Sequence, residues 1–363
     1  MFSIVVGFRN REIDRVKRSL DSILNQNNKN VEVVFVDYGS EPEISNKVSG
    51  LLENYDFVTY VYEDSRGKFW NRGHALNIGI RLAKGELCIL WDIDLIADPV
   101  FLDSLASVDF SQEFTTHNCY YLSENWQTTV SPFNQYDKVA YVGLMVVATN
   151  VLKEIGGFDE YYMIWGVEDE DIRLRLEWSG LTNRELSVEQ SSVYHQWHPE
   201  ADSVFHDWWY IAMLHYVQRN KTINRNEGKF GLISQRKTTN WLDEDIRYFD
   251  CKLWDSSRLR FLPFYNDFNA LPAGEYGRLT CFGQNISAGK LEGFVAKLNR
   301  LLESQKFFNY RLIRKEKLKV SKYNELSAVY QWLCWFIGEN RDKIEDYHIE
   351  KSATKLVFSF LKK

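Results

Sequence analysis

This sequence has fewer basic than acidic residues, and it has no closely spaced pair of cysteines. Lys and Arg together number 44 against 50 Asp and Glu, which gives a formal net charge of −6. Neutralising the phosphates of a nucleic acid needs a strongly basic face, so this balance argues against a nucleic-acid partner. The five cysteines form no Cys-x-x-Cys pair, and their odd number predicts neither a disulfide framework nor a zinc site.

Long apolar runs are missing as well. No run reaches the roughly 20 residues that cross a membrane, and the first strand-like segment, residues 2–8, lies so near the N-terminus that we expect no signal peptide. These features favour a cytoplasmic location. The 363 residues, 45% of them hydrophobic, are enough for one large and one smaller domain, each with its own core.

Two glycine-rich phosphate-binding motifs are absent too. No Gly-x-Gly-x-x-Gly follows the first expected strand, which argues against a dinucleotide-binding dehydrogenase. Residues 283–290 have one residue too many for a P-loop and lack the Ser or Thr that should follow the lysine. A nucleotide site, if present, must therefore be built in another way.

What the sequence does contain is an alternation of strand and helix patterns over residues 1–200. Apolar runs predict strands at residues 2–8, 31–36, 57–62, 85–91 and 140–149. Helical spacing of apolar residues follows the first strand, covers about 71–82 and returns after residue 168. Such alternation predicts an α/β fold with a mostly parallel sheet flanked by helices. We expect residues 1–215 to form this domain and 216–363 a smaller, mixed and largely helical region.

Two acidic residues, Asp92 and Asp94, follow the fourth expected strand. Because residues two apart on a strand point to one face, both side chains should converge at the carboxyl end of the strand, where open α/β sheets bind ligands. Carboxylate oxygens in a partly open site suit Mg²⁺ or Mn²⁺ bridging phosphate oxygens. The alternative is a solvated acidic turn leading into Pro99.

A second acidic run, residues 168–171, opens the helix expected after residue 168. Acids at a helix N-terminus are stabilised by the helix dipole, by roughly 0.3–1 kcal/mol each. Four acids exceed what capping needs, since their mutual repulsion grows with each added charge. The excess favours a chemical role.

Four segments, in this order, resemble GT-A glycosyltransferases, above all the β-1,4-galactosyltransferase type and family 2 enzymes such as bacterial chondroitin polymerase domains. They are residues 8–11 (Phe-Arg-Asn-Arg), 69–77 (Phe-Trp-Asn-Arg-Gly-His-Ala-Leu-Asn), 92–96 (Asp-Ile-Asp-Leu-Ile) and 156–171, which runs from Gly-Gly-Phe-Asp to Trp-Gly-Val-Glu-Asp-Glu-Asp. The resemblance covers about residues 1–200 and implies a GT-A fold.

The resemblance implies roles for residues that would bind the donor. Phe8, Arg9 and Arg11 would line the uridine diphosphate. Asp37, at the end of the second strand, would accept the uracil imide hydrogen. Arg72 would contact the diphosphate or the neighbouring sugar.

The resemblance also implies a metal site for Mn²⁺ or Mg²⁺. Asp94 would bind the ion directly, while Asp92 would act on the ribose or reach the ion through water. His195 falls where such enzymes place a third ligand and is favoured over His198. Ser192 replaces a methionine ligand of the galactosyltransferases, which implies a harder, more oxygen-rich site.

The remaining implied roles concern the reaction. Glu168 would hold the acceptor, Asp169 would be the general base, and Trp165 would offer a ring face to the sugar. The implied activity is inverting transfer from a UDP-sugar, with UDP-galactose favoured, to a saccharide or glycolipid in surface polysaccharide or lipopolysaccharide synthesis. The alternatives are a retaining enzyme, whose relatives carry Asn at the position of Asp169, and a non-catalytic carbohydrate-binding homologue.

The C-terminal part is less informative. Strand-like runs at 259–264 and 276–282 precede an amphipathic stretch at 291–302 that most simply packs as core. Seven basic residues and one acid then follow between Lys306 and Lys322. This run predicts a solvated helix face, or alternatively a surface that contacts anionic lipid at the inner face of a membrane.

Overall fold

The computed structural model describes most of the chain. The described residues are 1–127, 135–164, 166–199, 216–217, 220–233, 247–251, 254–255, 258–259, 268–282, 325–352 and 355–363. They form two compact units, and the described residues 220–233 belong to the first. Among the described residues, no helix has the length and apolar character needed to cross a membrane.

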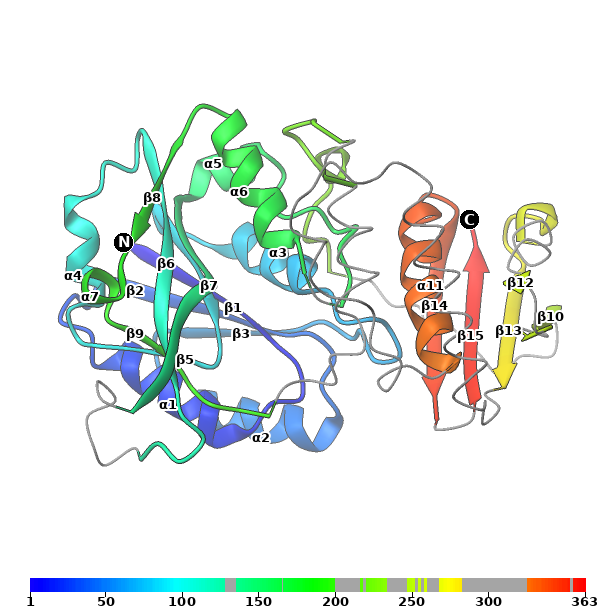
Figure 1. Cartoon of the computed structure of the whole chain (residues 1–363), viewed down its shortest axis with the longest axis horizontal. Coiled ribbons are helices and arrows are strands. Elements are labelled where there is room, and N and C mark those ends of the chain that lie inside the picture. The colour runs from blue at the N-terminus through cyan, green and yellow to red at the C-terminus, as the bar shows by residue number, and fades with distance from the viewer. Residues whose placement is uncertain are drawn as a thin grey trace. The chain divides into compact units, whose positions relative to one another are not determined.

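The first unit is built on a nine-stranded sheet with the order β3-β2-β1-β4-β7-β6-β9-β5, and β8 pairs with β6 (Figure 1). Its strands are β1 (Phe2–Phe8), β2 (Val31–Asp37), β3 (Val58–Tyr62), β4 (Leu87–Asp92), β5 (Leu95–Ala97), β6 (Glu113–Leu122), β7 (Tyr136–Ala148), β8 (Thr182–Leu186) and β9 (Val193–His195). The parallel pairing predicted from the sequence holds for β3, β2, β1 and β4. β7 then runs antiparallel to β4, so the sheet as a whole is mixed.

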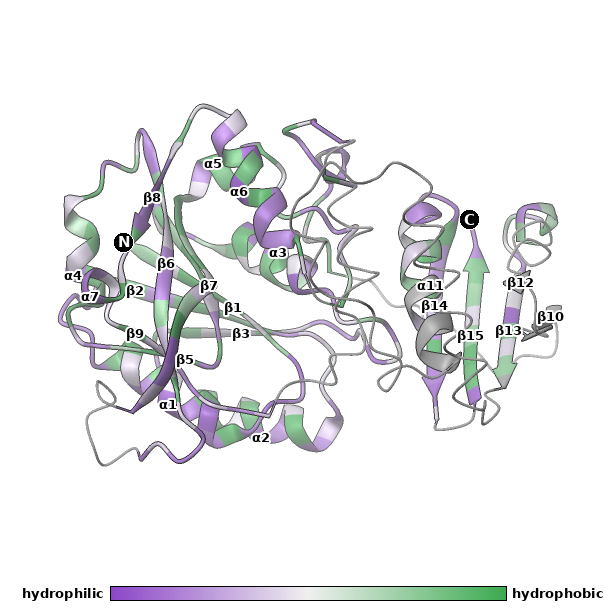
Figure 2. Ribbon diagram, in the orientation of Figure 1, coloured by the Kyte–Doolittle hydropathy of each residue, from purple (hydrophilic) through white to green (hydrophobic). Residues whose placement is uncertain are grey.

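Helices cover both faces of this sheet. They are α1 (Ile13–Leu24), α2 (Pro42–Leu52), α3 (Arg72–Leu82), α4 (Phe101–Ser104), α5 (Thr149–Glu154), α6 (Glu168–Trp178) and α7 (Val188–Ser191), with short 3₁₀ turns at η1 (Leu105–Ser107) and η2 (Asn226–Gly228). Alternate residues of β1 point to opposite faces, so Ile4 packs with α1 whereas Val5 packs with α3. Figure 2 shows hydrophobic residues along the central strands and mixed hydropathy along the helices, as two buried layers require.

The second unit contains a four-stranded sheet in the order β10-β13-β15-β14 and a separate β11-β12 pair. Its elements are β10 (Arg247–Cys251), β11 (Trp254–Asp255), β12 (Arg258–Leu259), β13 (Tyr276–Phe282), α11 (Glu325–Glu339), β14 (Ile344–Lys351) and β15 (Lys355–Lys362). Phe336 of α11 packs against Phe268 and Phe358, with ring centroids 4.9 and 6.2 Å away. The strand predicted at 276–282 is confirmed, while the amphipathic and basic stretches at 291–322 lie outside the described residues.

Candidate active site

Arg72 joins acidic residues from two distant parts of the chain. It is the first residue of α3, and its guanidinium donates to Asp92 Oδ1 at 2.9 Å and to Asp169 Oδ1 at 2.7 Å. Glu168 Oε1 lies 4.0 Å from the same guanidinium. The two acidic segments singled out in the sequence therefore meet at one arginine, at the end of β4 and the start of α6.

Gly143 of β7 makes room for this contact. Its carbonyl oxygen accepts a third hydrogen bond from Arg72, at 3.1 Å. A Cβ atom at residue 143 would lie 2.7 Å from Asp169 Oδ2 and 2.8 Å from Arg72 Nη2, closer than Cβ atoms approach their neighbours in proteins. Glycine therefore lets β7 pass the ion pair without displacing the ends of these two side chains. No pattern in the sequence marks Gly143, because its close neighbours, Arg72 and Asp169, are distant along the chain.

The backbone before α6 is held in an unusual conformation. Ile164 and Val167 have φ angles of 76° and 74°, in the left-handed region that β-branched residues rarely adopt. Such conformations cost about 1–3 kcal/mol each and persist only where surrounding contacts hold them. One such contact is the hydrogen bond from the Ile164 N–H to the Trp70 carbonyl, at 2.7 Å. Trp165 itself lies outside the described residues.

Burial changes the titration of the acidic pair. Loss of solvation and the adjacent Asp169 charge raise the pKa of Glu168 to about 7. Burial also raises the pKa of Asp169, and the Arg72 charge opposes that rise. The surrounding carboxylates outweigh burial at Arg72 and hold its pKa well above the ordinary value. Near neutral pH, Glu168 can therefore exchange a proton while Arg72 stays charged.

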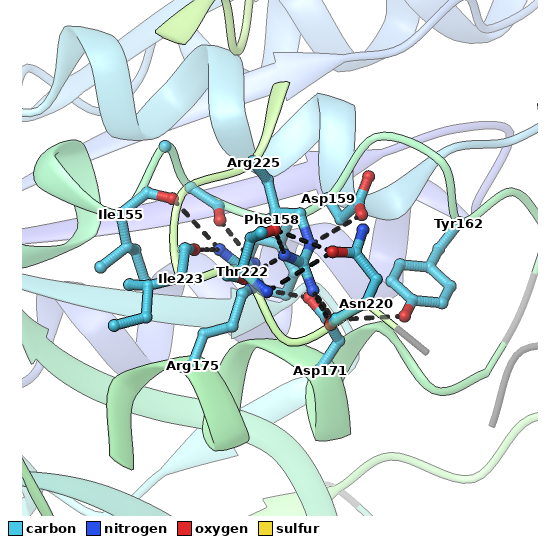
Figure 3. Close-up of polar contacts among 12 residues, drawn as sticks. Ile155, Phe158, Asp159, Tyr162, Asp171, Arg175, Asn220, Thr222, Ile223 and Arg225 are labelled. Atoms are coloured by element: carbon cyan, nitrogen blue, oxygen red, sulfur yellow. Dashed lines mark hydrogen bonds and ion pairs between the residues drawn. The ribbon is translucent and has the colours of Figure 1, made fainter. Parts of the chain in front are cut away.

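Four buried charges anchor α6 just beyond this pair (Figure 3). Asp171 accepts a hydrogen bond from Arg175 Nε at 2.7 Å and another from Arg225 Nη2 at 3.2 Å. Asp159 Oδ2 forms an ion pair with Arg225 Nε at 3.0 Å, without hydrogen-bond geometry. All four side chains are at most 2% exposed. Two positive and two negative charges thus compensate one another inside the protein.

The same arginines tie separate segments of the chain to α6. Arg175 donates to the carbonyl oxygens of Ile155, Gly157 and Ile223 at 2.7–3.2 Å, and Arg225 donates to Asn220 O at 2.8 Å. The loop before the left-handed bend, the helix after it and the segment around 220–226 are therefore fixed together. Arg225 lies in a polar stretch of the sequence in which no motif marks it.

Asp94, in the turn after β4, faces two histidines. His195 Nε2 lies 3.6 Å from Asp94 Oδ1, and His198 Nε2 lies 3.3 Å from Asp94 Oδ2. The antiparallel pairing of β5 with β9 sets His195 opposite Leu95, which brings the end of β9 beside Asp94. The potential ligand atoms of the three residues lie within 4.8 Å of one another.

The structure separates Asp92 from Asp94. β4 ends at Asp92 and residue 94 lies in a turn, so the strand alternation that predicted their convergence does not reach Asp94. Asp92 contacts Arg72 instead. Among the described residues, the set that could hold a metal ion is Asp94, His195 and His198, without Asp92 and with both histidines. Two imidazoles take the place of the oxygen-rich set expected from Ser192.

These three residues fit a divalent cation. Asp94 Oδ1 is a buried carboxylate oxygen that accepts no hydrogen bond from the described residues. Such an oxygen costs free energy unless a donor or a cation meets it. Burial favours protonation of Asp94, but the two histidines outweigh it and hold the pKa of Asp94 below its ordinary value. An ionised carboxylate with two imidazole nitrogens is a common metal-binding set.

A polar cavity of about 150 Å³ opens beside His198. It is lined by Asn10, Arg11, Glu12, Arg15, His198 and Pro199. Arg15 is buried, and its Nε has no hydrogen-bond partner among the described residues. The positive charge of Arg11 acts on Asp94 and helps to lower the pKa of that carboxyl. Arg9, by contrast, points to the Ser65 carbonyl, at 3.4 Å.

Two residues expected to contact the donor are buried. The Phe8 ring is 1% exposed and packs against Phe35 with ring centroids 5.2 Å apart. Asp37 is fully buried, and its two oxygens accept hydrogen bonds from the Ser40 N–H at 2.9 Å and the Tyr60 hydroxyl at 3.0 Å. In this structure, Phe8 is a core residue and Asp37 holds the turn at 37–40, so neither side chain is free to contact a ligand.

Comparison with known families matches two regions of the chain. Residues 3–108 match the family described as Glycosyl transferase family 2, and residues 128–199 match the family described as N-terminal domain of galactosyltransferase. Human beta-1,4-galactosyltransferase 4 is 30% identical over 130 residues, which make up 34% of this chain and 34% of that protein. The match thus spans about a third of the relative's length.

Two solved structures with bound nucleotide sugars are similar to this chain. S. aureus TarS 1-349 in complex with UDP-GlcNAc is 16% identical, with a TM-score of 0.45, and the match covers 60% of this chain and 65% of that one. The mannosyltransferase PcManGT from Pyrobaculum calidifontis in complex with GDP-Man and Mn²⁺ is 20% identical, with a TM-score of 0.43 and coverage of 60% and 64%.

The residues of the site divide between the two matched regions. The first region holds Arg11, Arg72, Asp92 and Asp94, and the second holds Gly143, Glu168, Asp169, His195 and His198. The candidate site is therefore assembled from residues of both matched regions.

Proposed function

We propose that this chain is a metal-dependent, inverting glycosyltransferase that moves a hexose or N-acetylhexosamine from a UDP-sugar to a saccharide acceptor. One observation carries the proposal. A cation-binding set at Asp94 and an arginine-linked acidic pair at Glu168 and Asp169 lie at the carboxyl end of β4, within two glycosyltransferase-like regions. A cation site and an acidic pair suit a reaction that needs a cation at the leaving group and a base at the nucleophile.

The donor half of the site is the histidine cluster and the cavity beside it. Asp94, His195 and His198 would hold Mn²⁺ or Mg²⁺. When bound, such an ion supplies positive charge that offsets the charge growing on the leaving diphosphate. Arg11 would bind phosphate oxygens in the cavity, because a guanidinium can make two parallel hydrogen bonds to them.

The rest of the donor would follow the edge of the sheet. Arg9 would contact the nucleoside, and Trp165 would present a ring face to the sugar. Phe8 and Asp37 would support the nucleoside end from beneath, since both side chains are buried. Asp92 would act on the ribose only through the face of its carboxylate that Arg72 leaves open, as its side chain is 31% exposed.

The acceptor half is the pair at the start of α6. Glu168 would hold the acceptor hydroxyl and Asp169 would take its proton as the new oxygen–carbon bond forms and the bond to the diphosphate breaks. Arg72 would orient both carboxylates and favour the ionised form of Asp169. An aspartate at residue 169, where the resemblance places Asn in retaining relatives, supports inversion. A non-catalytic homologue would be expected to lose one of these acids.

The donor and the acceptor are further parts of the proposal. UDP-galactose is favoured because of the similarity to a human galactosyltransferase. The acceptor would be a saccharide or glycolipid of a surface polysaccharide or lipopolysaccharide. The second unit would contribute acceptor contacts, and the basic run between Lys306 and Lys322 would touch anionic lipid.

A donor screen tests the proposed function. The full chain is incubated with Mn²⁺ and a panel of UDP- and GDP-sugars, and release of the free nucleotide is measured. We expect release from one or a few UDP-sugars, with UDP-galactose among the best, and no release in EDTA. Release from GDP-sugars alone would refute the nucleotide preference, and an undiminished rate in EDTA would refute metal dependence.

A further inference from the structure

We propose that His198, and not Asp92, completes the metal-binding set with Asp94 and His195, and that this set binds transition-metal ions in preference to Mg²⁺. The inference rests on the proposed function only in that a divalent cation acts at this site. His198, which the resemblance placed behind His195, becomes a ligand, and Asp92 is no longer one.

The positions of the ligand atoms favour His198. Its Nε2 lies 3.3 Å from Asp94 Oδ2, closer than the 3.6 Å between His195 Nε2 and Asp94 Oδ1. The two imidazole rings lie side by side with centroids 5.2 Å apart. A cation placed among these atoms would also meet Asp94 Oδ1, the buried oxygen that finds no hydrogen-bond partner in the described part of the chain. Asp92 is not part of this set, and its Oδ1 accepts a hydrogen bond from Arg72 at 2.9 Å.

The tautomer of His198 also fits a ligand. Its Nδ1 lies 2.9 Å from the Pro199 carbonyl oxygen, which can only accept a hydrogen bond. In this contact Nδ1 donates its proton to the carbonyl oxygen, while Nε2 faces Asp94 Oδ2 at 3.3 Å. When Nε2 loses its proton, its lone pair lies on the side of Asp94, where a cation would take the place of that proton. Metal-binding histidines commonly donate their other ring N–H to a carbonyl or carboxylate in this way.

Gln196 holds the two histidines in place. It is fully buried between them in the sequence, and its backbone N–H donates to the Asp94 carbonyl oxygen at 2.8 Å. Its side-chain amide donates to Arg15 O at 3.2 Å and accepts from Arg18 Nε at 2.6 Å. The segment 195–198 is thereby attached to α1 as well as to the turn after β4. Gln196 is a positioning residue for the site.

The ligand types determine the expected choice of metal. Mg²⁺ takes oxygen ligands in a near-ideal octahedron and keeps several waters. Imidazole nitrogens suit first-row transition metals, for which affinity rises from Mn²⁺ to Cu²⁺ and is lower again for Zn²⁺. Two imidazoles and one carboxylate therefore favour Mn²⁺, Co²⁺ or Zn²⁺ over Mg²⁺.

Metal binding measured without any substrate tests the inference. Free Mn²⁺ is followed by electron paramagnetic resonance during titration of the full chain and of the variants His198→Ala, Asp92→Asn and Gln196→Ala. We expect His198→Ala to weaken Mn²⁺ binding by at least about tenfold, with a smaller loss for Gln196→Ala and a change of less than about twofold for Asp92→Asn. A hundredfold excess of Mg²⁺ should leave most of the Mn²⁺ bound.

Two controls keep the outcomes distinct. A thermal melt of each variant shows whether it folds, and His198→Gln provides a second substitution that keeps the side chain polar. Unchanged Mn²⁺ affinity in both folded His198 variants, or loss of binding in Asp92→Asn, would overturn the inference. If the expected pattern appears while the donor screen gives no nucleotide release, the metal assignment stands and the proposed function fails.

Discussion

The two polar regions of the site differ in whether their charged groups are already paired. At Arg72, one guanidinium reaches Asp92, Asp169 and the Gly143 carbonyl, so the charges are already paired. At Asp94, a buried carboxylate oxygen has no hydrogen-bond partner among the described residues, and the nearest groups are two imidazoles. The Arg72 region is already ordered by its own ion pairs, whereas the Asp94 region still has a carboxylate oxygen that can bind a cation.

Charged groups therefore serve a different purpose in each of the two regions. A paired arginine fixes the direction of the carboxylates around it and tunes their pKa values. An unpaired buried oxygen is costly in isolation and gains from a cation. The acidic helix start divides in the same way, because Asp169 faces the site while Asp171, two residues later, belongs to the buried network of Figure 3.

The largest expected effect comes from removing the base. In Asp169→Asn the amide keeps the shape but cannot take the proton, so the transfer rate should fall by about 10²–10⁴-fold. UDP affinity, measured by calorimetry, should change little, because the donor half of the site is not altered. A collapse of UDP affinity together with the rate would mean that Asp169 serves the donor or the fold instead.

Asp171→Asn should show the complementary behaviour. It leaves Arg175 and Arg225 with one buried carboxylate in place of two, and removing one partner of a buried pair costs about 3–5 kcal/mol. The free energy of unfolding is measured by urea titration of the full chain. Glu170→Gln, in the same helical turn but with an exposed side chain, is the matched control and should change stability by less than about 1 kcal/mol. Equal stability of the two variants would contradict the role assigned to the network.

Gly143→Ala tests the close approach of β7 to the ion pair. The added Cβ would meet Asp169 Oδ2 and Arg72 Nη2 and push the base out of position. A displacement of about 1 Å at a reacting group can cost about 10²-fold in rate. Gly50→Ala, where no atom lies within 4 Å of the added Cβ, is the control and should keep the wild-type rate. An active Gly143→Ala variant would show that the Arg72 contacts are dispensable.

The smallest effect is a change in pH dependence. Arg72 lowers the pKa of both Glu168 and Asp169. Its replacement by Gln should therefore raise both pKa values, and the base should become ionised only at higher pH. We expect the acidic limb of the kcat/KM profile to move to higher pH in Arg72→Gln. A limb that stays in place or moves to lower pH would contradict the coupling.

Much of the fold could be predicted from local patterns. The helix predicted over 71–82 is α3, and the strand predicted at 57–62 is β3 with one residue fewer. The spacing and number of apolar residues identify such elements, because the side chains that pack on or within the sheet must be apolar. α2 was not predicted, since Val48 and Leu52 are its only buried residues and give a weak pattern.

Several residues of the candidate site were singled out in the sequence, but the contacts between them could not be predicted from it. Asp92, Asp94 and residues 168–171 stood out as an acidic pair and an acidic run, whereas the histidines were implied by the resemblance to GT-A glycosyltransferases. The contacts between these residues depend on the turn at Asp94 and on the register of β5 with β9. Neither feature can be read from one segment of the sequence. Gly143 and Arg225 act entirely through contacts that are distant in the sequence, so no local signal marks them.

The stereochemistry of the first product tests the central claim most directly. UDP-α-galactose, or the best donor of the screen, is incubated with the protein and Mn²⁺, and the anomeric proton of the product is followed by NMR before the free sugar equilibrates. In-line attack assisted by Asp169, with the cation on the opposite side at Asp94, predicts a β-configured product. An α-configured product from the α-linked donor would contradict it.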